Sequence, residues 1–146
     1  MKTASKGAQG HKPTILLVDD QADVLISLQM TVKLRGYNTL AASSGPEAIR
    51  LVSENPGTID VVVTDYAMPE MNGRELIRHL QEMDPTLQFI AISGHATPEE
   101  VASLVALGVV AFLPKPFSLN DLHSAIEQAL ILRQQSKGAT AVSTRA

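Results

Sequence analysis

Residues 59–73 of the chain read IDVVVTDYAMPEMNG, the stretch that is most informative about its architecture. The segment 59–64 is almost continuously apolar and rich in valine, which favours strands. A strand this apolar is typical of a parallel sheet that helices cover on both faces. Asp65 follows directly, so we expect a carboxylate at the carboxyl end of a buried strand. Gly73 closes the stretch, and we expect it to permit a tight turn in the loop.

Four similar apolar runs flank this one and predict four further strands. Between the runs, apolar residues recur at helical spacing behind residues that cap helices, such as Ser44 with Glu47 and Thr97 with Glu100. Strands that alternate with helices in this way indicate an α/β fold with a parallel sheet. The predicted strands span residues 14–18, 37–41, 59–64, 88–92 and 109–113.

Polar side chains follow these strands at the sheet edge where ligands bind in parallel α/β folds. They are Asp19 and Asp20 after the first strand, Asp65 after the third, Ser93 after the fourth and Lys115 after the fifth. Each is an ordinary loop residue by itself, and Asp20 could simply cap the next helix. Three converging carboxylates, however, repel by about 4 kcal/mol per close pair at an effective dielectric of about 20. The cluster therefore indicates a cation site, and such oxygen ligands suit Mg²⁺.

Four segments together resemble the signature of response-regulator receiver domains. They are LLVDD at 16–20, VVVTDYAMPEMNG at 61–73, AISGHA at 91–96 and FLPKPF at 112–117. The resemblance covers about residues 13–133 and implies a flavodoxin-like (βα)5 fold, with five parallel strands in the order 2-1-3-4-5. It also implies a phosphoprotein of a two-component system, phosphorylated on the aspartate after the third strand, which here is Asp65.

The resemblance implies a role for each polar group at this edge. Asp65 would be the nucleophile that accepts a phosphoryl group from a phosphohistidine donor, with Mg²⁺ as cofactor. Asp20, Asp65 and the backbone carbonyl of Ala67 match the family's Mg²⁺ ligands, and Asp19 matches a residue that acts through metal-bound water. Lys115 would place a positive charge beside the phosphoryl oxygens.

The same resemblance implies a conformational switch. Ser93 would move toward the phosphoryl group and donate a hydrogen bond to it, and Phe112 would turn into the space behind it. Phe112 stands where the family often has tyrosine, so its coupling would depend on packing alone. Lys115-Pro116 matches a pair that is usually cis in the family and aims the lysine at the site.

The composition fits one compact domain within the 146 residues. We divide the chain into a flexible tail at 1–12, a receiver domain at 13–133 and a flexible tail at 134–146, where apolar periodicity ends. The net charge of -3 gives no general attraction to nucleic acid or anionic membranes. Because the sequence has no cysteine, signal peptide or membrane-length apolar segment, we expect a cytoplasmic protein without membrane association.

Other functions use related chemistry. A flavodoxin would need a phosphate-binding loop where this chain has two aspartates, and an aspartyl phosphatase of the haloacid dehalogenase type would need a second aspartate where Gln21 stands. We therefore expect a receiver that is not an enzyme, beyond catalysing its own phosphorylation and dephosphorylation. A phosphate-carrying intermediate of a relay, or a receiver excised from a hybrid histidine kinase, are the alternatives.

The expected partners are a sensor histidine kinase or a histidine phosphotransfer protein, and an output protein that the sequence does not name. Direct DNA binding is not expected, because a helix-turn-helix domain needs about 60 further residues and 13 follow Arg133. The fourth predicted helix, 98–107, has more apolar residues than one buried face can use. We expect this helix, with the fifth strand and fifth helix, to form a phosphorylation-sensitive docking or homodimer surface.

Overall fold

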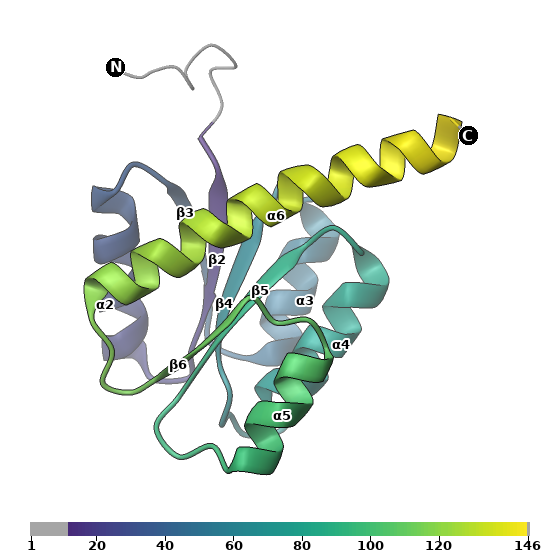
Figure 1. Cartoon of the computed structure of the whole chain (residues 1–146). Coiled ribbons are helices and arrows are strands. Elements are labelled where there is room, and N and C mark those ends of the chain that lie inside the picture. Colours follow the sequence, from purple (N-terminus) through teal and green to yellow (C-terminus); the bar gives the residue numbers. More distant parts are fainter. Residues whose placement is uncertain (1–11, 146) are drawn as a thin grey trace.

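The computed structural model describes residues 12–145, and the side chains of residues 12–138. Its strands are β2 (Thr14–Val18), β3 (Asn38–Ala42), β4 (Val61–Asp65), β5 (Gln88–Ser93) and β6 (Ala111–Pro114). They form one parallel sheet in the order β3-β2-β4-β5-β6 (Figure 1). Counted along the chain this is the order 2-1-3-4-5, so the predicted flavodoxin-like α/β fold is confirmed.

Helices join the strands, and their starts follow the capping residues of the sequence. The predicted caps Ser44 and Thr97 each accept a hydrogen bond from a backbone N–H of the first turn, and Ser118 does the same at the start of α6. Asn72 forms a further capping box with Glu75, which we had not predicted. The helices are α2 (Ala22–Leu34), α3 (Gly45–Glu54), α4 (Gly73–Met83), α5 (Pro98–Ala106) and α6 (Leu119–Arg145).

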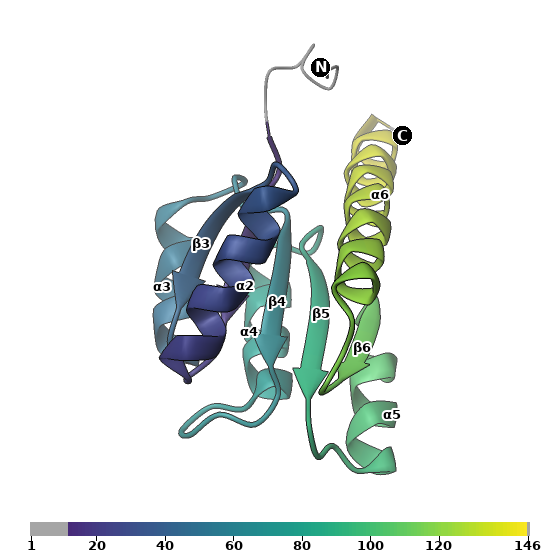
Figure 2. The same ribbon diagram turned by 90° about the vertical axis from the view of Figure 1, so that its left-hand side faces the viewer.

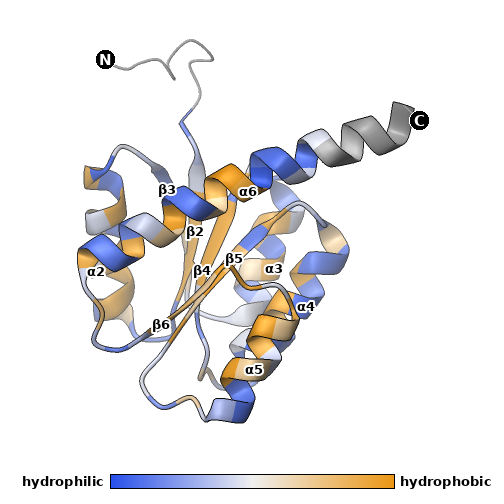
Figure 3. Cartoon of the chain, viewed as in Figure 1, coloured by the Kyte–Doolittle hydropathy of each residue, from blue (hydrophilic) through white to orange (hydrophobic). Residues whose placement is uncertain are grey.

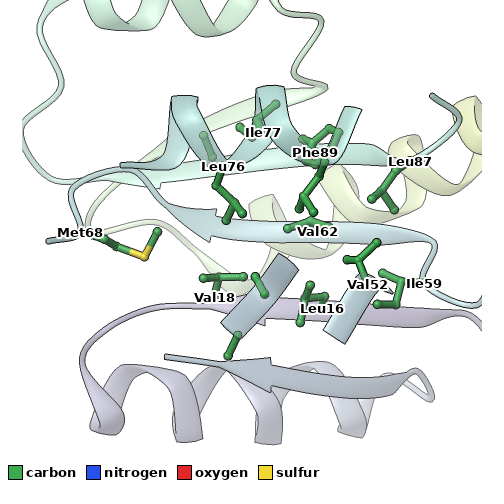
Figure 4. Packing of buried hydrophobic residues seen from close by; sticks show 14 of the residues in the cluster. Leu16, Val18, Val52, Ile59, Val62, Met68, Leu76, Ile77, Leu87 and Phe89 are labelled. Atoms are coloured by element: carbon green, nitrogen blue, oxygen red, sulfur yellow. The ribbon is translucent and has the colours of Figure 1, made fainter. Parts of the chain in front are cut away.

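Alternation along the strands divides the core into two layers. Side chains such as Ile15 and Val63 pack with the buried residues of α2 and α6. Their neighbours, among them Leu16, Val62 and Phe89, point to the other face and pack with α3, α4 and α5 (Figure 4). The inner strands are accordingly buried along nearly their whole length and largely apolar (Figure 3), as expected of strands covered on both faces.

Strand boundaries differ slightly from the prediction, for reasons visible in the hydrogen bonds. β4 begins at Val61 rather than residue 59, and the carboxylate of Asp60 accepts a bond from the Thr14 N–H at 2.9 Å. β6 begins at Ala111 because the Val109 N–H bonds back to α5, at 3.3 Å from the Leu104 carbonyl. A run of apolar residues therefore predicted the strands but could not separate them from adjoining turns.

α6 is longer than the sequence indicated. The helix continues through Arg145 (Figures 1 and 2), whereas residues 134–146 were expected to form a flexible tail without regular structure. The sequence did not predict this helical extension, because its polar and small residues lack an apolar stripe, although such residues can continue a helix whose first half is well packed. The expected tail at 1–12 lies outside the described residues except for Lys12, which is exposed. In the described part of the chain, no helix combines the length and apolarity needed to cross a membrane.

Arg133 anchors α6 to the amino-terminal edge of the sheet. Its side chain is 3% exposed. The guanidinium donates to Asp60 Oδ1 and to Thr86 Oγ1, both at 2.8 Å, and lies 3.5 Å from Asp84 Oδ2. These bonds join α6 to the segments that precede β4 and β5. The helix is thereby held at the point where its apolar stripe ends.

Candidate functional site

The carboxyl ends of the strands meet at one edge of the sheet (Figure 2), which brings the predicted polar groups together. Asp19 follows β2 directly, Asp20 comes next, and Asp65 is the last residue of β4. One carboxylate oxygen of each lies within 4.8 Å of the other two. Asp19 and Asp65 are buried and Asp20 is exposed, so the cluster opens to solvent on one side.

Backbone contacts on both sides fix Asp65. The Tyr66 N–H donates to the Ile92 carbonyl at 2.8 Å, and the Tyr66 carbonyl accepts from the Gly73 N–H at 2.7 Å. The Thr64 hydroxyl donates to the carbonyl of Asp65 itself at 2.9 Å. Because of these bonds, the peptide group after Asp65 is tied both to β5 and to the start of α4, and these two elements set the position of the carboxylate.

Glycine is needed at position 73 because a side chain would not fit there, and not because the chain makes a tight turn. A Cβ here would lie 2.9 Å from both the Asp65 carbonyl oxygen and the Tyr66 Cα. Gly73 is the first residue of α4, and the left-handed residue of the preceding loop is Glu70, with a φ of 72°. The prediction of a turn glycine was therefore wrong. The missing side chain lets α4 begin directly against the backbone of Asp65 and Tyr66.

Lys115 supplies positive charge to the cluster. Its Nζ lies 3.5 Å from Asp65 Oδ1 and 3.8 Å from Asp19 Oδ2. The Lys115-Pro116 peptide bond is cis, as the resemblance implied. The Lys115 N–H donates to the Ser93 carbonyl at 2.9 Å, which holds the start of this segment against β5. The lysine is thus placed to pair with negative charge at Asp65.

Ser93 and Phe112 lie on neighbouring strands beside the cluster. Ser93 is buried at the end of β5, and its hydroxyl accepts from the His95 N–H at 3.2 Å. Phe112, in β6, is paired with Ala91 of β5 and is half-buried against the core layer that also contacts Tyr66. Ser93 is therefore on the strand next to Asp65 and is buried, whereas Phe112 is one strand further away and is half-buried.

The electrostatics of the cluster favour a bound cation. Burial raises the pKa of Asp65 above its ordinary value, and the negative charge of Asp19 raises it further. Lys115 opposes this rise in the pKa through its charge and a hydrogen bond, while Asp20 adds to it. One ammonium group therefore faces three carboxylates. A divalent cation would offset the remaining negative charge.

The donor groups fit Mg²⁺ in number and kind. This ion prefers oxygen ligands, uses few carboxylates and keeps several water molecules, which suits a cluster open on one side. Asp20 is free for this purpose, since the helix cap of α2 is Gln21 and makes no side-chain cap bond. Asp19 instead accepts from the Gln21 N–H at 2.8 Å. The alternative reading of Asp20 as a helix cap is thus wrong.

A cavity of about 780 Å³ opens beside the carboxylates. Asp20, Asp65, Ala67, Ser93 and Lys115 are all in its wall, so residues from four separate loops and strand ends face one space. The cavity is open to solvent and large enough for a phosphoryl group together with water molecules. The arrangement brings together three carboxylates and a lysine around one open cavity, which are the groups that phosphoryl transfer to an aspartate would need.

The sequence of the whole domain agrees with this geometry. The family model of the response regulator receiver domain matches residues 15–127. The chain belongs to this family. The predicted resemblance is therefore confirmed, and the protein is a signalling domain of the two-component type.

Curated relatives carry this receiver domain within longer proteins. The sensor kinase CckA of Brucella abortus is 39% identical over 117 residues, which are 80% of this chain and 12% of the kinase. The transcriptional regulatory protein GlrR of Escherichia coli is 34% identical over 89% of this chain and 28% of the regulator. The chain thus spans less than a third of either relative.

Solved receiver structures have the same fold. A response regulator receiver domain from Clostridium thermocellum is 30% identical with a TM-score of 0.81, over 84% of this chain and 98% of that one. A response regulator receiver protein from Pseudomonas putida is 32% identical with a TM-score of 0.75, over 82% and 98% of the two chains. Both receivers are covered almost completely by this chain.

Some residues of the receiver site were not predicted. Thr64 had a signal in the sequence, since it is the polar side chain of an otherwise apolar run and precedes Asp65. Val24 and Phe117 line the cavity but had none, because apolar residues in these positions look like ordinary helix and loop residues. Only the packing of α2 against the loop after β6 places them at the site.

Proposed function

We propose that this receiver is the phosphoacceptor of a two-component or phosphorelay system, with Asp65 accepting a phosphoryl group from a phosphohistidine. The observation that carries the proposal is the setting of Asp65 itself. Its carboxylate faces an open cavity, with two more carboxylates within 4.8 Å and Lys115 Nζ at 3.5 Å. Crowded carboxylates reduce stability unless a cation uses them, so the cluster supports a functional role.

The transfer is proposed to begin with ionised Asp65. A carboxylate oxygen attacks phosphorus, the phosphorus–nitrogen bond of the donor breaks, and the electron pair returns to the imidazole, which takes a proton from solvent. Asp20, Asp65 and the Ala67 carbonyl would hold Mg²⁺, with Asp19 acting through metal-bound water. When bound, this cation offsets the charge of the transferred group. Lys115 neutralises one phosphoryl oxygen from the other side.

The switch is proposed to follow from contacts that exist only after transfer. In the unmodified protein the Ser93 hydroxyl accepts a hydrogen bond from the His95 N–H, so the hydroxyl proton remains available for a phosphoryl oxygen. Lys115 would exchange its carboxylate partners for the phosphoryl group. Movement of Ser93 would open space for Phe112, which is half-buried. Such differential contacts are what shift a protein between two arrangements.

The proposed donor is a sensor histidine kinase or a histidine phosphotransfer protein, and the proposed output is a protein contact in the cytoplasm without direct DNA or membrane binding. Similarity to a domain of a sensor kinase and to part of a transcriptional regulator supports both a relay intermediate and a receiver of a hybrid kinase. The aspartyl phosphatase alternative finds no support, since Gln21 is exposed and offers no second carboxylate.

Incubation with acetyl phosphate and Mg²⁺ tests the proposal. We expect a mass increase of one phosphoryl group per chain, located at Asp65 by peptide mapping, and no increase in EDTA. Repeated turnover of phosphomonoesters would instead favour the phosphatase. No mass increase at saturating acetyl phosphate and Mg²⁺ would contradict the function proposed for Asp65.

The donor is proposed to dock along α2. The cavity at Asp65 shares Val24 and Phe117 with a groove of about 330 Å³ that runs along this helix. Ile26, Met30 and Leu34, which we call the α2 stripe, are 57%, 62% and 85% exposed and are spaced four residues apart. They therefore lie along one side of α2. The α2 stripe belongs to the same helix as the groove, although none of its three residues lines the groove or the cavity. Exposed apolar side chains on this helix suit an apolar helix of the donor protein.

Ile26→Glu should reduce phosphotransfer from a histidine-phosphorylated donor protein by about tenfold, because a charge in an apolar contact costs on the order of 1.4 kcal/mol or more. The rate with acetyl phosphate should stay unchanged, since a small donor does not use the stripe. Ile131→Glu is the matched control, because Ile131 lies on α6 and is 53% exposed. Equal transfer rates for the two variants would place the donor surface elsewhere.

The output surface is proposed on α5, β6 and α6. As expected, part of the apolar excess of α5 is exposed: Val105 is 64% exposed, whereas Leu104 is fully buried. Val105→Glu should weaken self-association of the phosphorylated protein by about tenfold while leaving phosphorylation intact. Sedimentation at several concentrations measures this, with Ile26→Glu as control. Unchanged association of the Val105 variant would show that α5 is not the interface.

A further inference from the structure

Few side chains hold α5 to the domain. All nine residues of α5 are described, and Leu104 alone among them is buried. Two side chains of α4 bond to this helix and its C-cap: Arg74 Nε donates to the Ser103 hydroxyl, and Gln81 Nε2 donates to the carbonyl of the C-cap residue Leu107 at 2.7 Å. Because little apolar surface anchors α5, these two bonds contribute a large share of what fixes its position.

Arg74 is also connected to Asp65 through the backbone. It follows Gly73, whose N–H donates to the Tyr66 carbonyl at 2.7 Å. Gly73 packs so closely on Asp65 and Tyr66 that a Cβ would come within 2.9 Å of their backbone atoms. A displacement of the Asp65–Tyr66 peptide therefore has to displace the first turn of α4. Arg74 lies in that turn.

The side chain of Tyr66 occupies the same region. Burial raises the pKa of Tyr66, the negative charge of Glu100 raises it further, and Arg74 lowers it. Glu100 belongs to the capping box of α5, where its carboxylate accepts from the Thr97 N–H at 2.9 Å. The charges of Arg74 on α4 and Glu100 on α5 thus act in opposite directions on the pKa of the residue that follows Asp65.

We propose that Arg74 is a positioning residue that couples the phosphorylation state of Asp65 to α5 through its bond to Ser103. The proposal rests on the function proposed above for Asp65. In the unmodified protein, the bonds of Arg74 and Gln81 hold α5 against α4. A phosphoryl group on Asp65 displaces the adjoining peptide and the start of α4, which weakens the Arg74–Ser103 bond and loosens α5. This route runs through α4 and is separate from the switch residues of β5 and β6.

Hydrogen exchange of the α5 amides tests the bond in the unmodified protein. Ser103→Ala removes the acceptor and suits a helix, and Arg74→Lys keeps the charge but loses the planar Nε donor. Both variants should exchange their α5 amides roughly three- to tenfold faster than wild type, as the loss of one hydrogen bond predicts. Arg78→Lys is the matched control, because Arg78 is exposed one turn further along α4. Its exchange should equal that of wild type.

Beryllofluoride with Mg²⁺, an analogue of the phosphoryl group, tests the coupling. It should accelerate the exchange of the α5 amides in wild type. The acceleration that beryllofluoride causes should be at least about twofold smaller in Ser103→Ala, in Arg74→Lys and in the double variant, and these three should respond equally. Gln81→Met, which loses the second bond, should also loosen α5. The proposal would be overturned if the α5 amides of the two single variants exchanged as slowly as those of wild type. It would also be overturned if beryllofluoride accelerated exchange in these variants as much as in wild type. Failure of wild type to accept phosphate would refute the proposed function separately, since the first measurement needs no phosphorylation.

Discussion

Asp65→Asn should abolish phosphorylation by acetyl phosphate in Mg²⁺, with no phosphoryl group detected on the chain. The physical reason is that a neutral amide is not a nucleophile toward phosphorus, whereas a carboxylate is. Intact-mass spectrometry measures the effect, and Asp121→Asn is the control, since Asp121 is an exposed aspartate in the first turn of α6. Stoichiometric phosphorylation of the Asp65 variant would place the acceptor at another residue.

The same variant should be more stable than wild type when Mg²⁺ is absent. Burial first, and the charge of Asp19 second, raise the pKa of Asp65 in the folded protein. A carboxyl group with a raised folded pKa contributes stability that is present below its unfolded pKa of about 3.9 and is lost as pH rises through the folded value. Wild type therefore bears the cost of an ionised Asp65 at neutral pH, and the asparagine variant does not.

Thermal unfolding in EDTA at several pH values measures this difference. The midpoint of Asp65→Asn should exceed that of wild type at pH 7, and the gap should close below about pH 3.5, where the carboxyl group is protonated in both states. Added Mg²⁺ should raise the midpoint of wild type more than that of the variant, because the ion binds the folded cluster. A lower midpoint for the variant at pH 7 would show that the carboxylates are not crowded.

Arg133→Ala should lower the free energy of unfolding by about 3 kcal/mol, the largest stability loss that we predict. The guanidinium is 3% exposed and donates to Asp60 and Thr86 at 2.8 Å. Its removal leaves the carboxylates of Asp60 and Asp84 without their partner. Because these side chains are 19% and 22% exposed, water offsets part of the loss. Urea denaturation followed by circular dichroism measures the change.

Arg50→Ala is the matched control for this loss. Arg50 also donates to a carboxylate, that of Glu54 at 2.9 Å, but the two side chains are 54% and 55% exposed. An exposed pair at this helical spacing contributes about 0.3–0.5 kcal/mol. Equal losses for Arg133→Ala and Arg50→Ala would show that the buried network does not anchor α6.

The Arg133 network also predicts a dependence on pH. Burial alone would raise the pKa of Asp84, but hydrogen bonds from Thr86 and the charge of Arg133 lower it. A lowered folded pKa contributes stability that is present above the unfolded pKa and is lost as pH falls through the folded value. The difference between wild type and Arg133→Ala should therefore narrow in acid, as the carboxyl group becomes protonated.

The strand order and the polar cluster could be predicted because both follow from local patterns. Apolar runs that end in a polar residue indicate strands and their carboxyl ends, and parallel strands bring those ends to one edge. Asp19, Asp65, Ser93 and Lys115 are adjacent for this reason alone. The resemblance to a known family added the order of the strands in the sheet and the roles of the site residues. The spacing of the apolar runs does not contain this information.

Contacts between distant segments could not be predicted in this way. Arg133 follows Ala129 on the packed side of α6, and an arginine there reads as the end of an apolar stripe. Its partners Asp60 and Thr86 lie 73 and 47 residues away, so nothing local marks them. Gly73 was misread for a similar reason, because its close contact is with the backbone of another segment.

The outer edge of the sheet at β6 bears on how the protein behaves at high concentration. An open edge strand can template pairing with another chain and so begin aggregation. β6 is four residues long and ends at Pro114, which stands opposite Ser93 and has no N–H to offer a further strand. The exposed side of this strand is therefore a poor template for sheet extension. Association through the neighbouring helices should therefore not grow into a continuous sheet at this edge, because contacts between side chains do not pair backbones.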